Sequence, residues 1–176
     1  MERADAEVWA ALTTGIYILT TRSGSSGHGM SASWVVQVSG TPPLLAAAVG
    51  RQTFSHDRIA ADKVFGLNVV GKRSRFLQDY FHSASARRPE NLDAVQWFWS
   101  PGKVPWLTAA LLRLECHVVE EVAVGDRTLF VSRIGAFCWG EADRPLSSHD
   151  LPYVYVGEIH PTPRWQDSRT RKGGPT

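Results

Sequence analysis

The sequence predicts a mainly β domain with a few helices, folded as a closed antiparallel barrel with helical additions. Many short β-rich runs, few helical patterns and frequent turn signals between them predict this class. With 176 residues, of which 43% are hydrophobic and 20% charged, the chain has the composition of one globular domain able to bury a core. We expect this domain to span residues 1–160, followed by a basic tail over 161–176.

The N-terminal third is expected to contain one helix and three strands. Glu2–Leu12 carries apolar residues at helical spacing. The β-rich runs Ile16–Thr21 and Met30–Ser39 should form a hairpin around a turn at Ser23–Gly27. The apolar run Leu44–Val49 should add the third strand.

The middle of the chain predicts two helices, Phe54–Ala61 and Arg73–Phe81, on either side of a buried strand at Val64–Val70. Ser83–Pro105 is expected to be irregular, because three prolines interrupt any regular pattern. A segment of this length serves as a lid, as a dimer contact or as a surface excursion packed onto the domain, and the sequence leaves these open.

A long hairpin is expected near the C-terminus, with strands at Leu112–Val124 and Thr128–Trp139 around a turn at Gly125-Asp126. Glu120 interrupts the alternation of the first strand, which indicates a bulge or the rim of the sheet. Tyr153–Val156 should add a last strand.

The two cysteines are expected to be free, mostly buried thiols. A two-residue turn at 125–126 places Cys116 opposite Gly135 and Cys138 opposite Arg113. The two thiols are then too far out of register for a disulfide.

The charge of the chain is +2, and it is unevenly placed. After Pro163 there are four basic residues against one acidic residue, so the rest of the chain has 15 basic and 16 acidic residues. Nucleic-acid binding is not expected, because the body lacks a broad basic face. No signal peptide or membrane span is visible, so we expect no membrane partner and a cytoplasmic location.

One part of the sequence is suited to an anionic ligand. Between positions 7 and 57 there is no Asp or Glu, although the chain has 17. The same stretch holds Arg22, Arg51, His28 and His56, so an anion meets little repulsion there.

A phosphate-bearing, flat ligand along two strands is the interpretation that these residues favour. Thr53 or Ser55 can cap a helix whose first N–H groups bind phosphate, and Arg51 can add a charge-assisted contact. Small residues would let the ligand approach the backbone at Gly29, Ser31, Ala32 and Ser33. A helix cap beside an ordinary strand pair explains the same residues equally well.

Three other motifs are rejected. Gly27–Ala32 matches G-x-G-x-x-A, but a strand-like run follows where a dinucleotide-binding fold needs a helix. Ser55-His56-Asp57 cannot act as a catalytic triad, since triad partners come from separated segments. The six histidines lack metal-binding spacing, so no metal site is expected.

Longer segments resemble the flavin reductase-like family over roughly Leu12 to Gly140. The matching segments, in order, are Thr14–Thr21, Gly29–Trp34, Val38–Pro43, Val64–Val70, Leu111–Cys116 and Gly125–Val131. The resemblance implies an FMN-binding split β-barrel, usually a homodimer with the flavin near the subunit boundary.

The resemblance also implies which residues hold FMN. The isoalloxazine ring would lie along the backbone of Ser31, Ala32, Ser33, Trp34 and Val35, with Trp34 either shielding the ring or filling the core. Arg51, Thr53, Ser55 and His56 would surround the ribityl phosphate. No side chain is named as catalytic, because the flavin itself carries the redox chemistry.

Arg127 is a departure from the family pattern, since many members that use NAD(P)H carry His after the Gly-Asp turn. Arginine at this position is suited to hold a phosphate-bearing nicotinamide cofactor, or else it indicates that a protein supplies the electrons. Two functions stay open. One is an FMN-dependent oxidoreductase of the flavin reductase type, which takes hydride from NAD(P)H and passes electrons to flavin or another acceptor. The other is an FMN-containing electron-transfer protein, similar to flavoredoxin, that is reduced by a partner protein.

Overall fold

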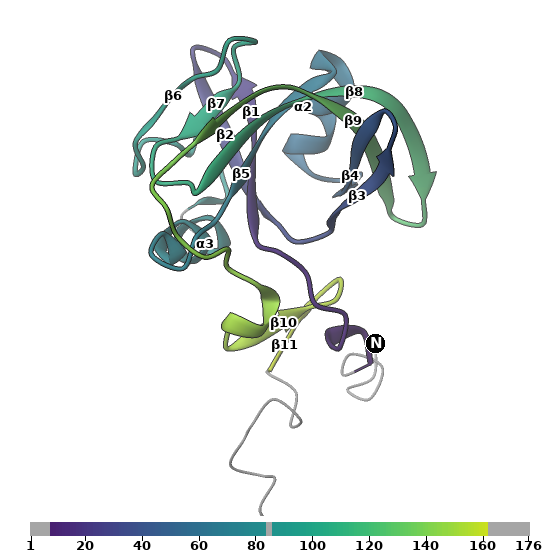
Figure 1. Cartoon of the computed structure of the whole chain (residues 1–176), viewed down its shortest axis with the longest axis vertical. Coiled ribbons are helices and arrows are strands. Elements are labelled where there is room, and N and C mark those ends of the chain that lie inside the picture. The colour runs from purple at the N-terminus through teal and green to yellow at the C-terminus, as the bar shows by residue number, and fades with distance from the viewer. Residues whose placement is uncertain (1–7, 84–85, 162–176) are drawn as a thin grey trace, which may run out of the picture. The chain divides into compact units, whose positions relative to one another are not determined.

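The computed structural model describes residues 8–83 and 86–161. These residues form two compact units. The larger unit is Gly15–Leu146, and the smaller unit combines the segments that precede and follow it. The larger unit is built on a seven-stranded antiparallel sheet, which curls into a barrel-like wall (Figure 1). The sheet order is β2-β1-β5-β8-β9-β4-β3, with β1 at Tyr17–Ser23, β2 at Ser26–Ala32, β3 at Val35–Gly40, β4 at Pro43–Gly50, β5 at Val64–Val69, β8 at Leu112–Val124 and β9 at Arg127–Trp139.

This arrangement confirms the mainly β class but not full closure of the barrel. The edge strands β2 and β3 follow one another in sequence, and in the described residues no strand ladder joins them. The single strand expected over Met30–Ser39 is wrong for the same reason: it is interrupted at Ser33-Trp34. The carbonyl of Trp34 accepts a hydrogen bond from the N–H of Ala48 (2.9 Å), so the chain changes partner there, from β1 to β4.

The helices α2 (Phe54–Asp62) and α3 (Arg75–His82) confirm the two helices predicted in the middle of the chain. The segment expected to be irregular contains a short hairpin, β6 (Trp97–Trp99) paired with β7 (Pro105–Leu107). Its aromatic residues favour strand pairing even between prolines.

The smaller unit contains β10 (Tyr153–Tyr155), which pairs with β11 (Ile159–Pro161) rather than with the main sheet. It also contains a 3₁₀ turn, η2 (Ser148–Asp150), and three helical residues at positions 8–10. Of the helix expected over Glu2–Leu12, residues 11 and 12 are a turn and a bend, and residues 2–7 lie outside the described residues, as does nearly all of the basic tail.

The β8–β9 hairpin has two bulges that change its predicted register. One lies between Val118 and Glu120, as the interrupted alternation predicted, and moves Cys116 opposite Ile134 instead of Gly135. The second, after Glu115, restores the register, so Cys138 pairs with Arg113 as expected. Both cysteines are free, as predicted.

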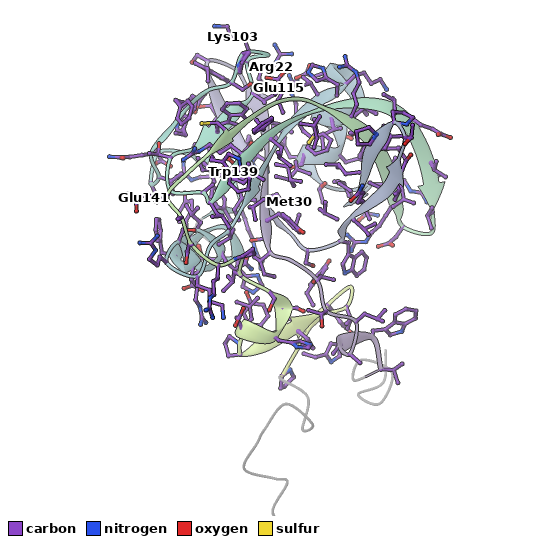
Figure 2. All side chains as sticks on the ribbon, viewed as in Figure 1. Arg22, Met30, Lys103, Glu115, Trp139 and Glu141 are labelled. Atoms are coloured by element: carbon purple, nitrogen blue, oxygen red, sulfur yellow. The ribbon has the colours of Figure 1, made fainter. Side chains whose placement is uncertain are left out.

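The core of the larger unit lies inside the curled sheet. Leu19, Phe65, Leu67 and Phe130 are almost fully buried there, and Met30 packs against them (Figure 2). Burial of these large apolar side chains provides the main free energy that holds the strands in place. The core therefore fixes the ends of β2, β3 and β4, where the predicted ligand residues lie.

Candidate functional site

The N-terminus of α2 is built for an anion. Thr53 caps the helix: its hydroxyl accepts a hydrogen bond from the N–H of His56 (3.2 Å) and donates to the carbonyl of Gly50 (2.8 Å). In the part of the chain that the structure describes, no hydrogen bond engages the N–H groups of Phe54 and Ser55. These two groups lie at the positive end of the helix dipole and can bind a phosphate.

Arg51 lies two residues before the cap, in the turn between β4 and α2. Its side chain is exposed, and its backbone N–H donates to the carbonyl of Asp126 (3.1 Å). Ser55 is completely buried. The predicted phosphate residues thus lie together, with Arg51 exposed and Ser55 beneath the surface.

His56 is held by protein partners on both ring nitrogens. Nε2 lies 2.9 Å from the hydroxyl of Thr128 on β9, and Nδ1 lies 3.3 Å from a carboxylate oxygen of Asp57. The ring also packs against Phe130 at 5.4 Å. His56 therefore anchors α2 to β9, and Thr128 is a supporting residue that the sequence did not indicate.

The residues Ser31–Val35 run from the end of β2, through the break in the sheet, to the start of β3. All five are half-buried. Val35 pairs with Ala47, three residues before Gly50, which places this segment about 10 Å along β4 from the phosphate end. The structure brings the two predicted parts of the site to the same strand.

Trp34 and Arg127 join these two parts. The guanidinium carbon of Arg127 lies 4.1 Å from the centre of the Trp34 ring, which is a cation–π contact. Arg127 also pairs in register with Gly50 at the end of β4. The sequence related Arg127 to the electron donor and not to the flavin; its position opposite Gly50 follows from the β4–β9 pairing.

Three residues of the acid-free stretch do not belong to the site. Gly29 faces α3, where an added Cβ would collide with the ring of Phe81. The prediction that Gly29 gives room to a ligand is therefore wrong. His28 is buried, and burial lowers the pKa of its imidazole, so it brings no positive charge. Arg22 forms an ion pair with Asp62 (3.4 Å) at the far end of α2.

The described residues hold two buried hydroxyls without hydrogen-bond partners at this site, those of Ser31 and Ser55. Such hydroxyls are costly unless a partner is supplied. A ligand with several polar oxygens along a flat ring fits this arrangement, and a flavin nucleotide has that chemistry.

A cavity of about 460 Å³ lies elsewhere in the larger unit, and none of the predicted site residues lines it. Its wall includes Leu77 of α3, Leu111, Arg73 and Asp143. Arg73 and Asp143 are engaged with each other, since the N–H of Arg73 donates to the carboxylate (2.8 Å). The polar groups of this cavity therefore serve the fold.

Comparison with known proteins decides the family. The model of the flavin reductase like domain matches residues 9–158. The chain belongs to the flavin reductase-like family. The family predicted from the sequence is therefore confirmed.

Relatives with curated names are identical to the chain at about a quarter to a third of the aligned positions. The NADH-dependent flavin reductase of Rhodococcus is 31% identical over 136 residues, which cover 76% of this chain and 74% of the relative. The high molecular weight rubredoxin of Moorella thermoacetica is 26% identical over 157 residues, covering 88% of this chain and 66% of that protein. The chain thus spans just under two thirds of the length of the rubredoxin.

Solved structures support the same fold. The NADH:FAD oxidoreductase SgcE6 of Streptomyces globisporus C-1027 superposes with a TM-score of 0.71 at 25% identity, over 80% of this chain and 79% of that one. The flavin reductase PheA2 superposes with a TM-score of 0.72 at 24% identity, over 93% and 99%. The predicted flavin reductase-like fold class is confirmed.

Two further findings concern the described residues alone. They contain no group of three or more His, Cys, Asp or Glu residues placed to hold a metal ion. Among the helices they form, none has the length and apolar character needed to cross a membrane.

Proposed function

We propose that this protein is an NAD(P)H-dependent flavin oxidoreductase that binds FMN along the β2–β3 break and at the N-terminus of α2. The observation that carries the proposal is the anion corner at the end of β4, where Thr53 caps α2 and the N–H groups of Phe54 and Ser55 have no hydrogen-bond partner among the described residues. Family membership supplies the flavin as the ligand class.

The chemistry supplied by a bound flavin is two-electron transfer at its ring system. The residues of the chain bind the flavin and orient it. The half-buried segment Ser31–Val35 offers its backbone to the ring, and Arg51 with the start of α2 offers a positive potential to the phosphate. The interval between these parts, about 10 Å along β4, is of the size that a ribityl chain bridges.

FMN is favoured over FAD because the anion corner is small: one helix end, one capping residue and one exposed arginine. These groups suit a single terminal phosphate. SgcE6 is named as an FAD oxidoreductase, so both flavins belong in a binding test.

A homodimer is part of the proposal. Phe137 and Trp139 on β9 are each 64% exposed, and they share a sheet face with their cross-strand partners Leu114 and Leu112. An exposed apolar face of this kind is suited to a second copy of the chain.

An FMN-containing electron carrier, reduced by a partner protein, is the second candidate. The similarity to a high molecular weight rubredoxin favours it. The alignment with that protein covers 88% of this chain, and the name rubredoxin denotes electron transfer.

An absorbance spectrum of the purified protein, followed by anaerobic addition of NADH and then NADPH, tests both functions. Rapid bleaching of a bound flavin would establish the oxidoreductase and identify its donor. A bound flavin that stays oxidised would establish the carrier. A colourless protein that takes up neither FMN nor FAD would refute both.

A further inference from the structure

Arg127 is a fixed positive charge placed between the two parts of the proposed flavin site. It is the first residue of β9, and its neighbour across the sheet on β4 is Gly50, where the turn to α2 begins. The carbonyl of Asp126, just before it, accepts the backbone N–H of Arg51. The turn that carries Arg127 is therefore tied to the anion corner.

The guanidinium is held in place. It lies over the ring of Trp34, with 4.1 Å between the guanidinium carbon and the ring centre, and the side chain is only 15% exposed. Its Nη1 would lie 3.9 Å from a Cβ atom at Gly50. A cation fixed in this way loses little entropy when it acts on a ligand beside Trp34.

Two acidic side chains on the turns around this cation, those of Asp126 and Asp57, are exposed and screen it weakly. Asp126 lies 3.7 Å from Nε of Arg127, but its side chain is 84% exposed. Asp57, beside His56, is 80% exposed. Solvent and salt weaken the field of exposed carboxylates more than that of a mostly buried guanidinium. These two carboxylates therefore offset the charge of Arg127 only in part.

We propose that Arg127 raises the reduction potential of the bound flavin by stabilising its reduced, anionic form; this rests on the proposed function. In the reaction, NAD(P)H gives a hydride, that is two electrons and one proton, to the oxidised flavin. The products are NAD(P)⁺ and a reduced flavin with one additional negative charge on its ring. A cation beside the ring favours the reduced over the oxidised flavin, so it favours reduction by the donor.

The test compares the affinities for oxidised and reduced FMN, measured anaerobically by fluorescence titration, in Arg127→Gln, Arg127→Lys and the wild type. Arg133→Gln is the matched control, since Arg133 is an exposed residue on the same strand. We expect Arg127→Gln to weaken binding of reduced FMN about tenfold more than that of oxidised FMN, which corresponds to a potential lower by about 30 mV. Arg127→Lys should keep most of the wild-type ratio, and Arg133→Gln all of it.

Equal weakening of both redox states in Arg127→Gln would overturn the inference and make the residue a packing partner of Trp34. An unchanged ratio combined with a lost preference between NADH and NADPH would also overturn it, and would assign Arg127 to the donor. If the Gln variant does not fold, Arg127→Met, whose stem keeps the contact with Trp34, takes its place with the same criterion. Failure of the wild type to bind any flavin would instead refute the proposed function.

Discussion

Glu115 offers a quantitative test of what holds the β6–β7 hairpin on the sheet. Its side chain is 4% exposed on β8, beneath the hairpin tip that carries Lys103 (Figure 2). One carboxylate oxygen accepts hydrogen bonds from the hydroxyl of Ser100 and the N–H of Gly102, both at 2.6 Å. The other lies 2.7 Å from Nε2 of His117. Three partners thus converge on one buried carboxylate.

Glu115→Gln keeps the size of the side chain but not its capacity to accept three hydrogen bonds. An amide oxygen in the place of the first carboxylate oxygen still accepts from Ser100 and Gly102, whereas the amide NH2 group now faces His117. Hydrogen bonds to a charged group contribute about 1.5–3 kcal/mol each, so the variant loses the charged contact to His117 and weakens the other two to neutral hydrogen bonds. We expect a loss of about 3 kcal/mol in the free energy of unfolding, or a Tm lower by about 6–12 °C for a chain of this size.

The same contact predicts a pH dependence. Burial alone would raise the pKa of Glu115, but the hydrogen bonds from Ser100, Gly102 and His117 outweigh it and hold the pKa below its ordinary value. A carboxylate with a lowered folded-state pKa stabilises the fold above its unfolded-state pKa, about 4.3, and loses this effect as pH falls through the folded-state pKa. The difference between wild type and Glu115→Gln should therefore be full at neutral pH and shrink below about pH 4.3.

Thermal unfolding followed by circular dichroism measures both effects. Glu120→Gln is the matched control, because Glu120 lies on the same strand with an exposed side chain. If the two variants had the same Tm at pH 7, or if the Glu115→Gln deficit persisted at pH 3, the assignment of Glu115 as the charged anchor of the hairpin would be wrong.

Three other predictions address the site and the core. Arg51→Ala should weaken FMN binding several-fold, measured by fluorescence titration, and an unchanged Kd would remove Arg51 from the site. Gly29→Ala should lower the free energy of unfolding by about 1–3 kcal/mol through overpacking against α3, whereas Gly40→Ala, with open space around it, should not. Burial raises the pKa of the Cys116 thiol, so a thiol reagent at pH 8 should label Cys138 and leave Cys116 unmodified in the folded protein; prompt labelling of both would contradict the buried position.

The elements that the sequence predicted well are those with local signals. The helix predicted from Phe54 begins there, and Thr53, one of the two cap candidates, caps it, because capping depends on residues three apart. The Gly125-Asp126 turn likewise set the bounds of β8 and, within a residue, of β9. Such signals need no knowledge of distant partners.

The misses depend on partners far away in the chain. The break at Ser33-Trp34 is invisible in a β-rich run, because it arises where the Trp34 carbonyl pairs with Ala48. Gly29 was assigned to a ligand because its partner, Phe81, is 52 residues away. A glycine that admits a ligand and one that admits a neighbouring ring have the same sequence signature.

The structure changes which charged side chains of the acid-free stretch lie at the proposed site. Of its positive side chains, Arg22 pairs with Asp62 at the far end of α2, and His28 is buried with a lowered pKa. Arg51 remains exposed at the corner. The second cation, Arg127, lies outside the acid-free stretch. The β4–β9 pairing places it opposite Gly50, with its guanidinium over Trp34. The positive potential at the proposed site therefore comes from Arg51 and Arg127, which lie at different strand ends, and from the start of α2. Counting charges along the acid-free stretch could identify only Arg51.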